Sequence, residues 1–473
     1  MRRKSNKTSD QAILSALQAQ VAQAVPNPVL KCQLLQQEGE WLMAFERHFE
    51  KLKALPRRVR RTLQRHWKQS LAGIALLLAL GQVPALASAI NVGRTCTLAR
   101  AIVSANNDAS PRGFCRPGHG ADTIMLPAGS MQTLTAINNE HYGRTGLPVI
   151  RSGITIVGNG STIKRQSGTS PFRLFNVTKS GNLTLRQITL SGGVASGSFP
   201  NDQGSAIVNH GKTTLIKSTV SGNSADIDAA TLQNYEGNLA ITNSNIRSNK
   251  GYGVKSFLGT TKLTNSTVAN NSSTGVADTF GHLTVVNSTI SGNETGVSGA
   301  DSFLTLTDST ITGNASDGVE ALYSTNITLN RSLISGNAAA DEVEVRDNNV
   351  TARRAQEVYC DASSYMRAGN FNLFGQDGDA NVEGFIPGPT DIVPTQALSF
   401  MIDTTLANNG GHTLTHALLP GCPAIDAVNN GTCPPSVTDQ RGVRRPQDGN
   451  GDGGAACDIG SFEFRSTIQS PIQ

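Results

Sequence analysis

Ionisable side chains recur at one place beside a repeated Gly-Val pair of this chain. The residue after each pair is Lys255, Ala277, Ser298 and then Glu320, and Asp228 falls one coil earlier if Ile227 is the equivalent apolar residue. An acid and a base held together on an outer strand face could perform general acid–base chemistry. Ala277 and Ser298 interrupt the series, so Asp228, Lys255 and Glu320 are catalytic candidates in a broken column.

Oxygen-bearing side chains gather near the C-terminus. The stretch from Asp448 to Gly453 has the D-x-N-x-D-G order of a calcium loop, in which alternating oxygens face one point. Ile459 stands at the twelfth position, where such loops carry a bidentate Glu. The same residues also suit a polar turn. Two interpretations therefore stay open: a calcium site formed by Asp448, Asn450 and Asp452, or a turn. We expect no other cofactor.

Other ionisable residues of the C-terminal region favour structural roles. His412 and His416 are four residues apart and would share one face of a strand, but the pattern offers no third metal ligand. We therefore expect structural histidines. We predict an ion-paired clasp between the terminal strands, formed by Asp439, Arg441 and Glu463.

The cysteines indicate an oxidising compartment. Cys32 lies in the N-terminal leader, and none of the other six belongs to a CxxC pair. An even set of this kind favours disulfides over a zinc site. The disulfide candidates, whose pairing stays open, are Cys96, Cys115, Cys360, Cys422, Cys433 and Cys457.

A sequence motif recurs between Leu183 and Asn337, and the elements that it forms must position these residues. Its copies close at 193, 223, 249, 271, 293, 314 and 337, so the steps are 30, 26, 22, 22, 21 and 23 residues. The general form is Ser-x-Ile/Val-x-x-Asn, and alternating apolar and hydroxyl residues precede it. A period in the low twenties combined with period-2 alternation predicts a solenoid of short strands.

We predict an all-β fold, a right-handed parallel β-helix of the pectate-lyase-like type. One segment is too short to bury its apolar face, so it must stack on copies of itself at a spacing of ~4.8 Å. The corner Asn residues are expected to adopt a left-handed backbone and to bond one another in a ladder. A leucine-rich horseshoe has a similar period, but its Leu phrase and helical back are missing.

Charge is distributed unevenly along the 473 residues. The whole chain has 40 Lys+Arg and 35 Asp+Glu, but residues 1–89 hold 14 of the basic and 5 of the acidic residues. The remaining chain therefore carries 26 basic against 30 acidic residues. We expect no nucleic acid among the partners of the folded part.

The N-terminal region has the features of an export signal. Residues 1–69 form a basic, partly helical leader, and 70–89 contain an apolar run of ten residues, Leu71 to Leu80, with small residues after it. That run suits a signal peptide and is short for a membrane span of ~20 residues. We expect cleavable export, and membrane contact only through the leader if it stays uncleaved.

The sequence of residues 90–150 predicts an N-terminal cap. From Cys96 to Ile102 the chain reads Cys-Thr-Leu-Ala-Arg-Ala-Ile, a short amphipathic helix pattern, and Cys115 is near enough to staple it. A helix here can cover the first rung and block edge pairing. The segment resembles the CSLREA domain of bacterial surface and secreted β-helix proteins, with Ala99 and Arg100 where that family usually has Arg and Glu.

Residues 370–463 follow the rungs of 151–369 and contain several ordered phrases. These are Asn370 to Gly375, Asn408 to Leu418, Pro423 to Ala427, Asp439 to Pro446, and Cys457 to Glu463. Together they resemble the choice-of-anchor Q domain, which also occurs on bacterial β-helix proteins. Residues 464–473 form a tail. The resemblances imply a bacterial protein that is secreted, periplasmic or displayed at the cell surface.

The sequence supports two classes of function. The interrupted column and the family resemblances favour a non-catalytic protein that acts in surface display, adhesion or binding of an extended glycan or a surface protein. The alternative is a polysaccharide lyase or glycoside hydrolase acting on an acidic polysaccharide. Fold alone does not decide between them.

Overall fold

A computed structural model describes residues 89–466, except 111–112, 227, 338–340, 347–348, 369, 429–432 and 434–437. Side chains of 341–346 and 349–354 are also outside the description. The leader, Cys32, all but the last residue of the 70–89 segment, Ile227 and most of the tail therefore lie outside the described residues. Within the described part, no helix is long and apolar enough to cross a membrane.

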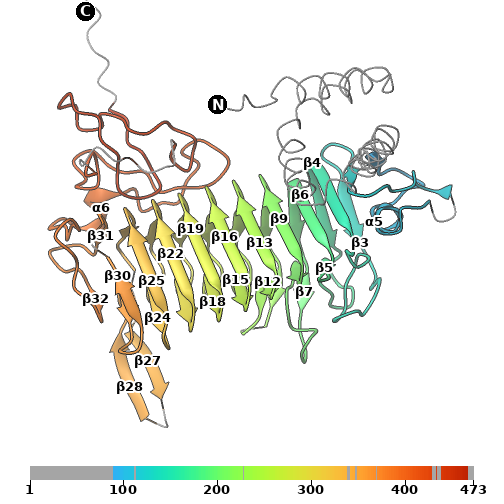
Figure 1. Ribbon diagram of the computed structural model, residues 1–473, viewed down its shortest axis with the longest axis horizontal. Coiled ribbons are helices and arrows are strands. Elements are labelled where there is room, and N and C mark those ends of the chain that lie inside the picture. Colours follow the sequence, from blue (N-terminus) through green and yellow to red (C-terminus); the bar gives the residue numbers. More distant parts are fainter. Residues whose placement is uncertain are drawn as a thin grey trace, which may run out of the picture. The chain divides into compact units, whose positions relative to one another are not determined.

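The described strands form a parallel β-helix, because equivalent strands of successive repeats pair in parallel (Figure 1). One face is a nine-stranded sheet. Its strands are β5 (Phe175–Val177), β8 (Ile207–Asn209), β12 (Ala230–Tyr235), β15 (Tyr252–Phe257), β18 (Val276–Thr279), β21 (Val297–Ala300), β24 (Val319–Leu322), β29 (Val358–Cys360) and β32 (Val382–Glu383).

The other two faces belong to one 19-stranded sheet and form two rows. The long row contains β9 (Lys212–Ile216), β13 (Asn238–Thr242), β16 (Thr260–Thr264), β19 (His282–Val286), β22 (Phe303–Thr307), β25 (Asn326–Asn330) and β30 (Tyr365–Arg367). The short row contains β10 (Thr219–Ser221), β14 (Asn245–Arg247), β17 (Thr267–Ala269), β20 (Thr289–Ser291), β23 (Thr310–Thr312), β26 (Leu333–Ile334) and β31 (Leu373–Phe374). Two strands contribute to both rows, β4 (Gly153–Arg165) and β6 (Asn182–Ser191).

Parallel stacking begins inside the segment predicted as the cap. β1 (Ala89–Asn91) pairs with β2 (Asp122–Met125), and both β2 and β3 (Met131–Leu134) pair with β4. Smaller pairs stand apart from the main faces: β7 (Val194–Ala195) with β11 (Ser224–Ala225), and the antiparallel hairpin of β27 (Asp341–Arg346) and β28 (Asn349–Arg354). The coil therefore starts before residue 151.

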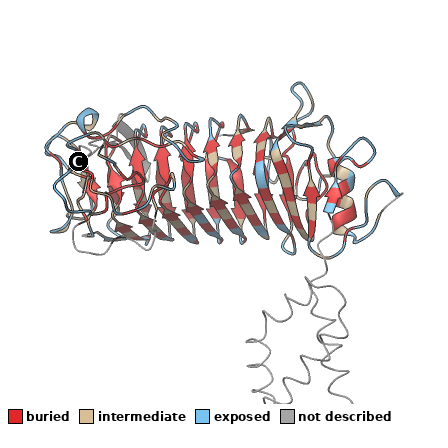
Figure 2. Ribbon diagram, turned by 90° about the horizontal axis from the view of Figure 1, so that it is seen from above, coloured by how far each residue is buried: buried red, intermediate tan, exposed pale blue. Residues whose placement is uncertain are grey.

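Inward side chains of the three faces make one core, and buried residues recur on strand after strand (Figure 2). Ile246, Val268, Ile290 and Ile311 show the principle: they are in register on neighbouring strands and have no exposed surface. Burying such side chains stabilises the fold by about 1.5–3 kcal/mol each.

A ladder of asparagine side chains runs along the coil. Each amide nitrogen donates to the side-chain oxygen of the next, as from Asn271 to Asn293 at 3.0 Å and from Asn293 to Asn314 at 3.1 Å. The last donor is Asn337, whose side chain bonds Glu357 at 2.6 Å. The predicted ladder exists, but its backbone conformation was predicted wrongly. The left-handed residue precedes each ladder Asn, as at Gly292 with φ 68°.

Helix α5 (Leu98–Asn106) covers the beginning of the coil. The Thr97 side chain caps it by accepting the Arg100 N–H, and Leu98, Ile102 and Ala105 are buried in the core of the coil. A disulfide joins Cys96 to Cys115 with an S–S distance of 1.98 Å. The amphipathic helix and its staple therefore occur as the sequence indicated.

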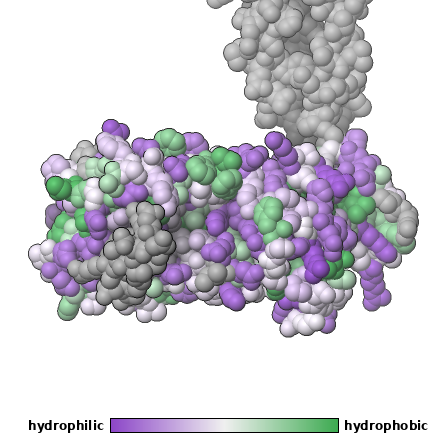
Figure 3. All heavy atoms as spheres, turned by 90° about the horizontal axis from the view of Figure 1, so that it is seen from below, coloured by the Kyte–Doolittle hydropathy of each residue, from purple (hydrophilic) through white to green (hydrophobic). Residues whose placement is uncertain are grey.

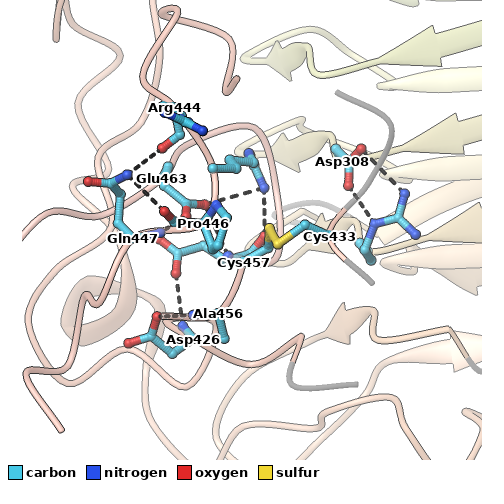
Figure 4. The surroundings of a disulfide bond; sticks show 12 residues. Asp308, Asp426, Cys433, Arg444, Pro446, Gln447, Ala456, Cys457 and Glu463 are labelled. Atoms are coloured by element: carbon cyan, nitrogen blue, oxygen red, sulfur yellow. Dashed lines mark hydrogen bonds and ion pairs between the residues drawn. A yellow bond between two sulfur atoms is a disulfide. The ribbon is translucent and has the colours of Figure 1, made fainter. Parts of the chain in front are cut away.

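The C-terminal segment packs on the outer face of the short row. Thr267 Oγ1 donates to the Leu414 carbonyl at 2.6 Å, and Thr289 Oγ1 donates to Gln440 Oε1 at 2.7 Å. This segment contains the short helix α6 (Leu398–Met401) and a second apolar core. The Cys433–Cys457 disulfide lies beside Gln447 and Glu463 (Figure 4). The segment thus covers a long face of the coil.

Two of the six disulfide candidates are not in disulfides. Cys360 and Cys422 are buried free thiols. Cys360 belongs to the core of the coil, whereas Cys422 belongs to the separate core of the C-terminal segment. The expectation of disulfides for all six is therefore wrong for this pair, because the fold places the two thiols in different cores.

Candidate functional site

The outer face of the nine-stranded sheet carries the predicted column. Strand register aligns Gln233, Lys255, Ala277, Ser298 and Glu320 on successive strands. Asp228 is not in this column, because Gln233 takes the position beside Lys255. The sequence prediction reached Asp228 by counting through Ile227 from the preceding corner. That count gave the wrong residue, because the turn before strand β12 differs in length from the turn before strand β15.

The three catalytic candidates do not converge. Lys255 Nζ donates to the main-chain oxygen of Asp228 at 3.1 Å and lies 4.6 Å from the centroid of the Tyr252 ring. Burial lowers the pKa of Lys255, and the charge of Asp228 acts in the opposite direction. Glu320 accepts a hydrogen bond from Ser298 Oγ at 2.9 Å. It lies three strands from Lys255, or roughly 14 Å at the usual strand spacing.

A denser group of side chains lies near the start of the same face. The Tyr142 ring meets the His210 ring edge to face at 4.2 Å between centroids, and Phe199 at 5.7 Å. His210 stacks on Tyr235, with centroids 5.5 Å apart and an interplanar angle of 15°. Edge-to-face and stacked pairs are favourable aromatic geometries.

Two loops, residues 140–146 and 198–202, cover this group, and we call them the roof loops. Arg173 Nη1 donates to the Tyr142 carbonyl and Nη2 to the Pro200 carbonyl, both at 2.5 Å. The Asn176 side-chain amide donates to the His141 carbonyl. The loops also contact each other, because Arg144 N–H donates to Asn201 Oδ1 at 3.0 Å. Side chains from the sheet end thus hold the roof.

The roof loops and the sheet end beneath them contain polar atoms that are buried without a hydrogen-bond partner in the described part of the chain. We call their residues, together with Tyr142, the roofed cluster. The atoms are Arg173 Nε, Asn176 Oδ1, Asp202 Oδ1, His210 Nε2 and Gln233 Oε1. Buried polar groups are nearly always bonded in folded proteins, so such a concentration is unusual and makes this place a candidate site.

Burial determines the protonation of the roofed cluster. It lowers the pKa of Arg173 to about 10, while Tyr142 and Asp202 act to raise it. Burial also raises the pKa of Tyr142 and lowers the pKa of His210. At neutral pH the cluster therefore presents a charged guanidinium, a neutral imidazole and a protonated phenol, all of which can form hydrogen bonds with hydroxyl groups.

Exposed aromatic side chains continue from the cluster along one corner of the coil. The corner joins the nine-stranded sheet to the long row, and we call its apolar side chains the aromatic ridge. Ring centroids are 6.2 Å apart from Tyr235 to Phe257 and 5.7 Å apart from Phe257 to Phe280. The ridge consists of the half-buried Tyr235 and the exposed Phe257, Leu258, Phe280, Phe303, Tyr323 and Tyr365.

Three ridge residues have an unfavourable backbone. Leu258, Phe280 and Tyr323 have φ of 54°, 56° and 51°. Bulky side chains rarely occupy this left-handed region, which costs about 1–2 kcal/mol. The same conformation occurs at the corner between the two rows, in Asn243, Asn265 and Asn287, for which it is common, and also in Gln187, Lys217 and Arg331. The left-handed backbone is thus a general feature of the corners, and it is the exposed apolar surface of the ridge that indicates a functional surface.

The predicted calcium loop uses its oxygens internally. Asp448 accepts the N–H groups of Gly451 at 2.7 Å and Gly453 at 3.0 Å, and Asn450 Oδ1 accepts that of Asp452 at 2.9 Å. The Asn450–Asp452 bond is that of an Asx turn, and the bonds to Asp448 close the same loop, so the geometry agrees with the turn interpretation. Calcium binding at Asp448, Asn450 and Asp452 stays a prediction.

His416 has a structural role between the coil and the C-terminal segment. Its Nε2 lies 2.9 Å from Ser291 Oγ, and its Nδ1 lies 2.8 Å from the Asp403 carbonyl. His412, by contrast, is exposed. The two imidazoles therefore do not act together.

The predicted clasp has different partners from those expected. Arg441 pairs with Asp439 at 2.6 Å but reaches only the main-chain oxygen of Glu463, at 2.5 Å. The Glu463 carboxylate lies 3.5 Å from the buried guanidinium of Arg445 instead. Burial raises the pKa of Glu463 and, to about 8, that of the neighbouring Asp458. A buried network of this kind closes the C-terminal segment.

Comparisons with known proteins add little to this geometry. No protein-family model matches the chain, and no curated protein matches it. The resemblances to the CSLREA and choice-of-anchor Q domains therefore stay predictions.

Several solved structures are similar to the chain. The pectate lyase Pel9A matches with a TM-score of 0.48 and 15% identity, over 73% of this chain and 88% of that one. The A-module of the Azotobacter vinelandii mannuronan C-5 epimerase AlgE6 matches with a TM-score of 0.35 and 14% identity, over 63% and 93%. The AlgE4 A-module matches with a TM-score of 0.30 and 15% identity, over 62% and 95%.

Sequence reasoning missed both the roofed cluster and the aromatic ridge. The ridge had a signal, since Phe257-Leu-Gly259 and Phe280-Gly281 place aromatic residues before a repeated corner glycine. The cluster had none, because Tyr142, Arg173 and Asp202 lie outside the recurring phrases and meet only through the roof loops.

Proposed function

We propose that this protein is an exported, non-catalytic binder of extended glycans, which lie along the aromatic ridge. The supporting observation is the row of exposed rings at one corner of successive coils. Sugar rings have apolar C–H faces that pack well on aromatic side chains. A polymer with a regular repeat can contact several rings of the ridge in turn, so many weak contacts add to useful affinity.

The surface of the coil suits a polymer ligand. One long face of the coil is largely hydrophilic, with separate hydrophobic patches (Figure 3). A protein partner would favour a larger continuous apolar patch. The proposed CSLREA-like cap and choice-of-anchor Q-like domain agree with a bacterial surface protein that acts in adhesion or display.

Binding of soluble polysaccharides tests this proposal. Phe280→Ala should weaken binding about tenfold, the loss expected for removing an aromatic anchor worth roughly 1–2 kcal/mol. Phe280 is 50% exposed, so its removal leaves the core intact. The matched control is Phe400→Ala, which removes a 70% exposed ring of the C-terminal segment. Equal affinities of both variants and wild type would remove the ridge from the site, and no binding to any polymer would refute the function.

The same mixtures test the catalytic alternative. A lyase would release unsaturated sugars and a hydrolase would release reducing ends, both of which can be followed over time. Turnover that disappears in Lys255→Ala or Asp228→Ala would replace binding by catalysis as the function. We expect no turnover, because the ionisable residues of the column are interrupted by Ala277 and Ser298.

A further inference from the structure

The unpartnered atoms of the roofed cluster are mostly acceptors. Asn176 Oδ1, Asp202 Oδ1 and Gln233 Oε1 can only accept hydrogen bonds, whereas Arg173 Nε can only donate. Asn176 and Gln233 are 1% and 2% exposed, so bulk solvent does not reach them. Each such group costs about 1–3 kcal/mol while it stays unpaired. A ligand rich in donors would recover this cost.

We propose that the roofed cluster is a subsite for one uncharged sugar unit, whose hydroxyl groups donate to Asn176, Asp202 and Gln233. This inference rests on the proposed glycan binding. Hydroxyl groups both donate and accept, so one of them can also accept from Arg173 Nε. The Tyr142 and Tyr235 rings supply apolar surface for the C–H face of the same sugar.

The charge and chemistry of the cluster disfavour an acidic sugar. A carboxylate has no donor, so it would meet the Asp202 carboxylate and two amide oxygens as one more acceptor. The guanidinium of Arg173 would attract a carboxylate, but two of its nitrogens already donate to the roof loops. The subsite therefore selects hydroxyl groups, in contrast to the acidic substrate expected from the lyase alternative.

The position of the subsite makes it one end of the glycan site. Tyr235 contacts Tyr142 and His210 of the roofed cluster and is also part of the ridge. Its ring centroid lies 6.2 Å from that of Phe257. Entry requires movement of the roof loop 198–202, which is held by Arg173 and by the Arg144–Asn201 hydrogen bond. A Cβ on Gly143 would come within 2.6 Å of Arg173 Nη2, so the closed roof leaves no spare space there.

Calorimetry with a matched pair of polymers tests the subsite. The probes are polygalacturonate and its carboxyl-reduced form, which keeps the linkage and replaces each carboxylate by a hydroxymethyl group. The reduced polymer should bind the wild-type protein about tenfold more tightly. Gln233→Met removes the acceptor but keeps the size of the side chain, so it should abolish this preference while the melting temperature stays equal or rises. Gln187→Met, the same change at an exposed position of the corner between the two rows, should leave the preference unchanged.

The outcomes separate the two proposals. Equal, ridge-dependent binding of both polymers would refute the subsite and leave the proposed function standing. Tighter binding of the acidic form would also refute the subsite. If Gln233→Met lowers the melting temperature and keeps the preference, the amide is structural and the assignment is wrong. If neither polymer binds, both proposals fall.

Discussion

Phe280 combines an exposed aromatic ring with a left-handed backbone. Its φ is 56°, a conformation that Asn adopts more readily than Phe. Phe280→Asn should therefore keep or raise the free energy of unfolding, by up to about 1 kcal/mol, while glycan affinity falls. Denaturant unfolding measures the first effect.

Phe303 provides the matched control for this trade-off. It is 54% exposed on the ridge, but it lies in strand β22 and is not left-handed. Phe303→Asn should lower stability, by up to about 1 kcal/mol, because Asn is unfavourable in strands. Equal losses of stability in both variants would show that the left-handed backbone of Phe280 is not strained.

Glu357 makes stability depend on pH. It accepts hydrogen bonds from Gly336 N–H at 2.7 Å and from both nitrogens of Asn337, yet burial raises its pKa from 4.5 to about 7. Between these values the folded state keeps a proton that the unfolded state releases. Stability from this group is therefore complete below pH 4.5 and falls as pH rises to about 7, by on the order of 3 kcal/mol.

Glu357→Gln removes this titration. Other buried acids with raised pKa values, Asp278 and Asp458, give slopes of the same sign, so the difference between wild type and variant is the informative quantity. The difference should change between pH 4.5 and 8 in urea unfolding measurements. Parallel curves across that range would contradict a raised pKa at Glu357.

At the scale of elements, the asparagine ladder ties each coil to the next. Asn293 accepts from Asn271 and donates to the Val268 carbonyl at 3.1 Å, so Asn293→Ala leaves buried groups on neighbouring coils unpaired. The expected loss is about 2–4 kcal/mol. Asn326→Ala, at an exposed position of strand β25, should change stability by less than about 0.5 kcal/mol. Similar losses for the two would show that the ladder contributes little.

At the scale of the whole molecule, the repeats were the most predictable part. Ser-x-Ile/Val-x-x-Asn predicted the stacking because each copy must bury its Ile or Val against the next, as Ile290 and Ile311 do. The corner backbone was misassigned because Gly292, and not Asn293, has the left-handed φ. The roofed cluster was unpredictable because Tyr142, Arg173 and Asp202 come from separate irregular loops, whose conformation has no period to follow.

The two disulfides concern the whole molecule, because they indicate its compartment and fasten the segments before and after the repeats. Cys96–Cys115 and Cys433–Cys457 fit an oxidising compartment. Export itself stays a prediction from the leader. Because the disulfides lie at the cap and in the C-terminal segment, they fasten the parts that flank the repeats, where stacking alone provides least support.

Hydrogen exchange with a bound polysaccharide is the most direct measurement of glycan binding at the ridge. Amide groups at 252–260 and 276–282, which carry Phe257 and Phe280, should exchange more slowly when the polymer is bound. The corner at 243, 265 and 287, where the chain turns between the two rows, should exchange at the same rate with and without polymer. Protection at that second corner, or no protection along the ridge, would contradict the proposed binding site.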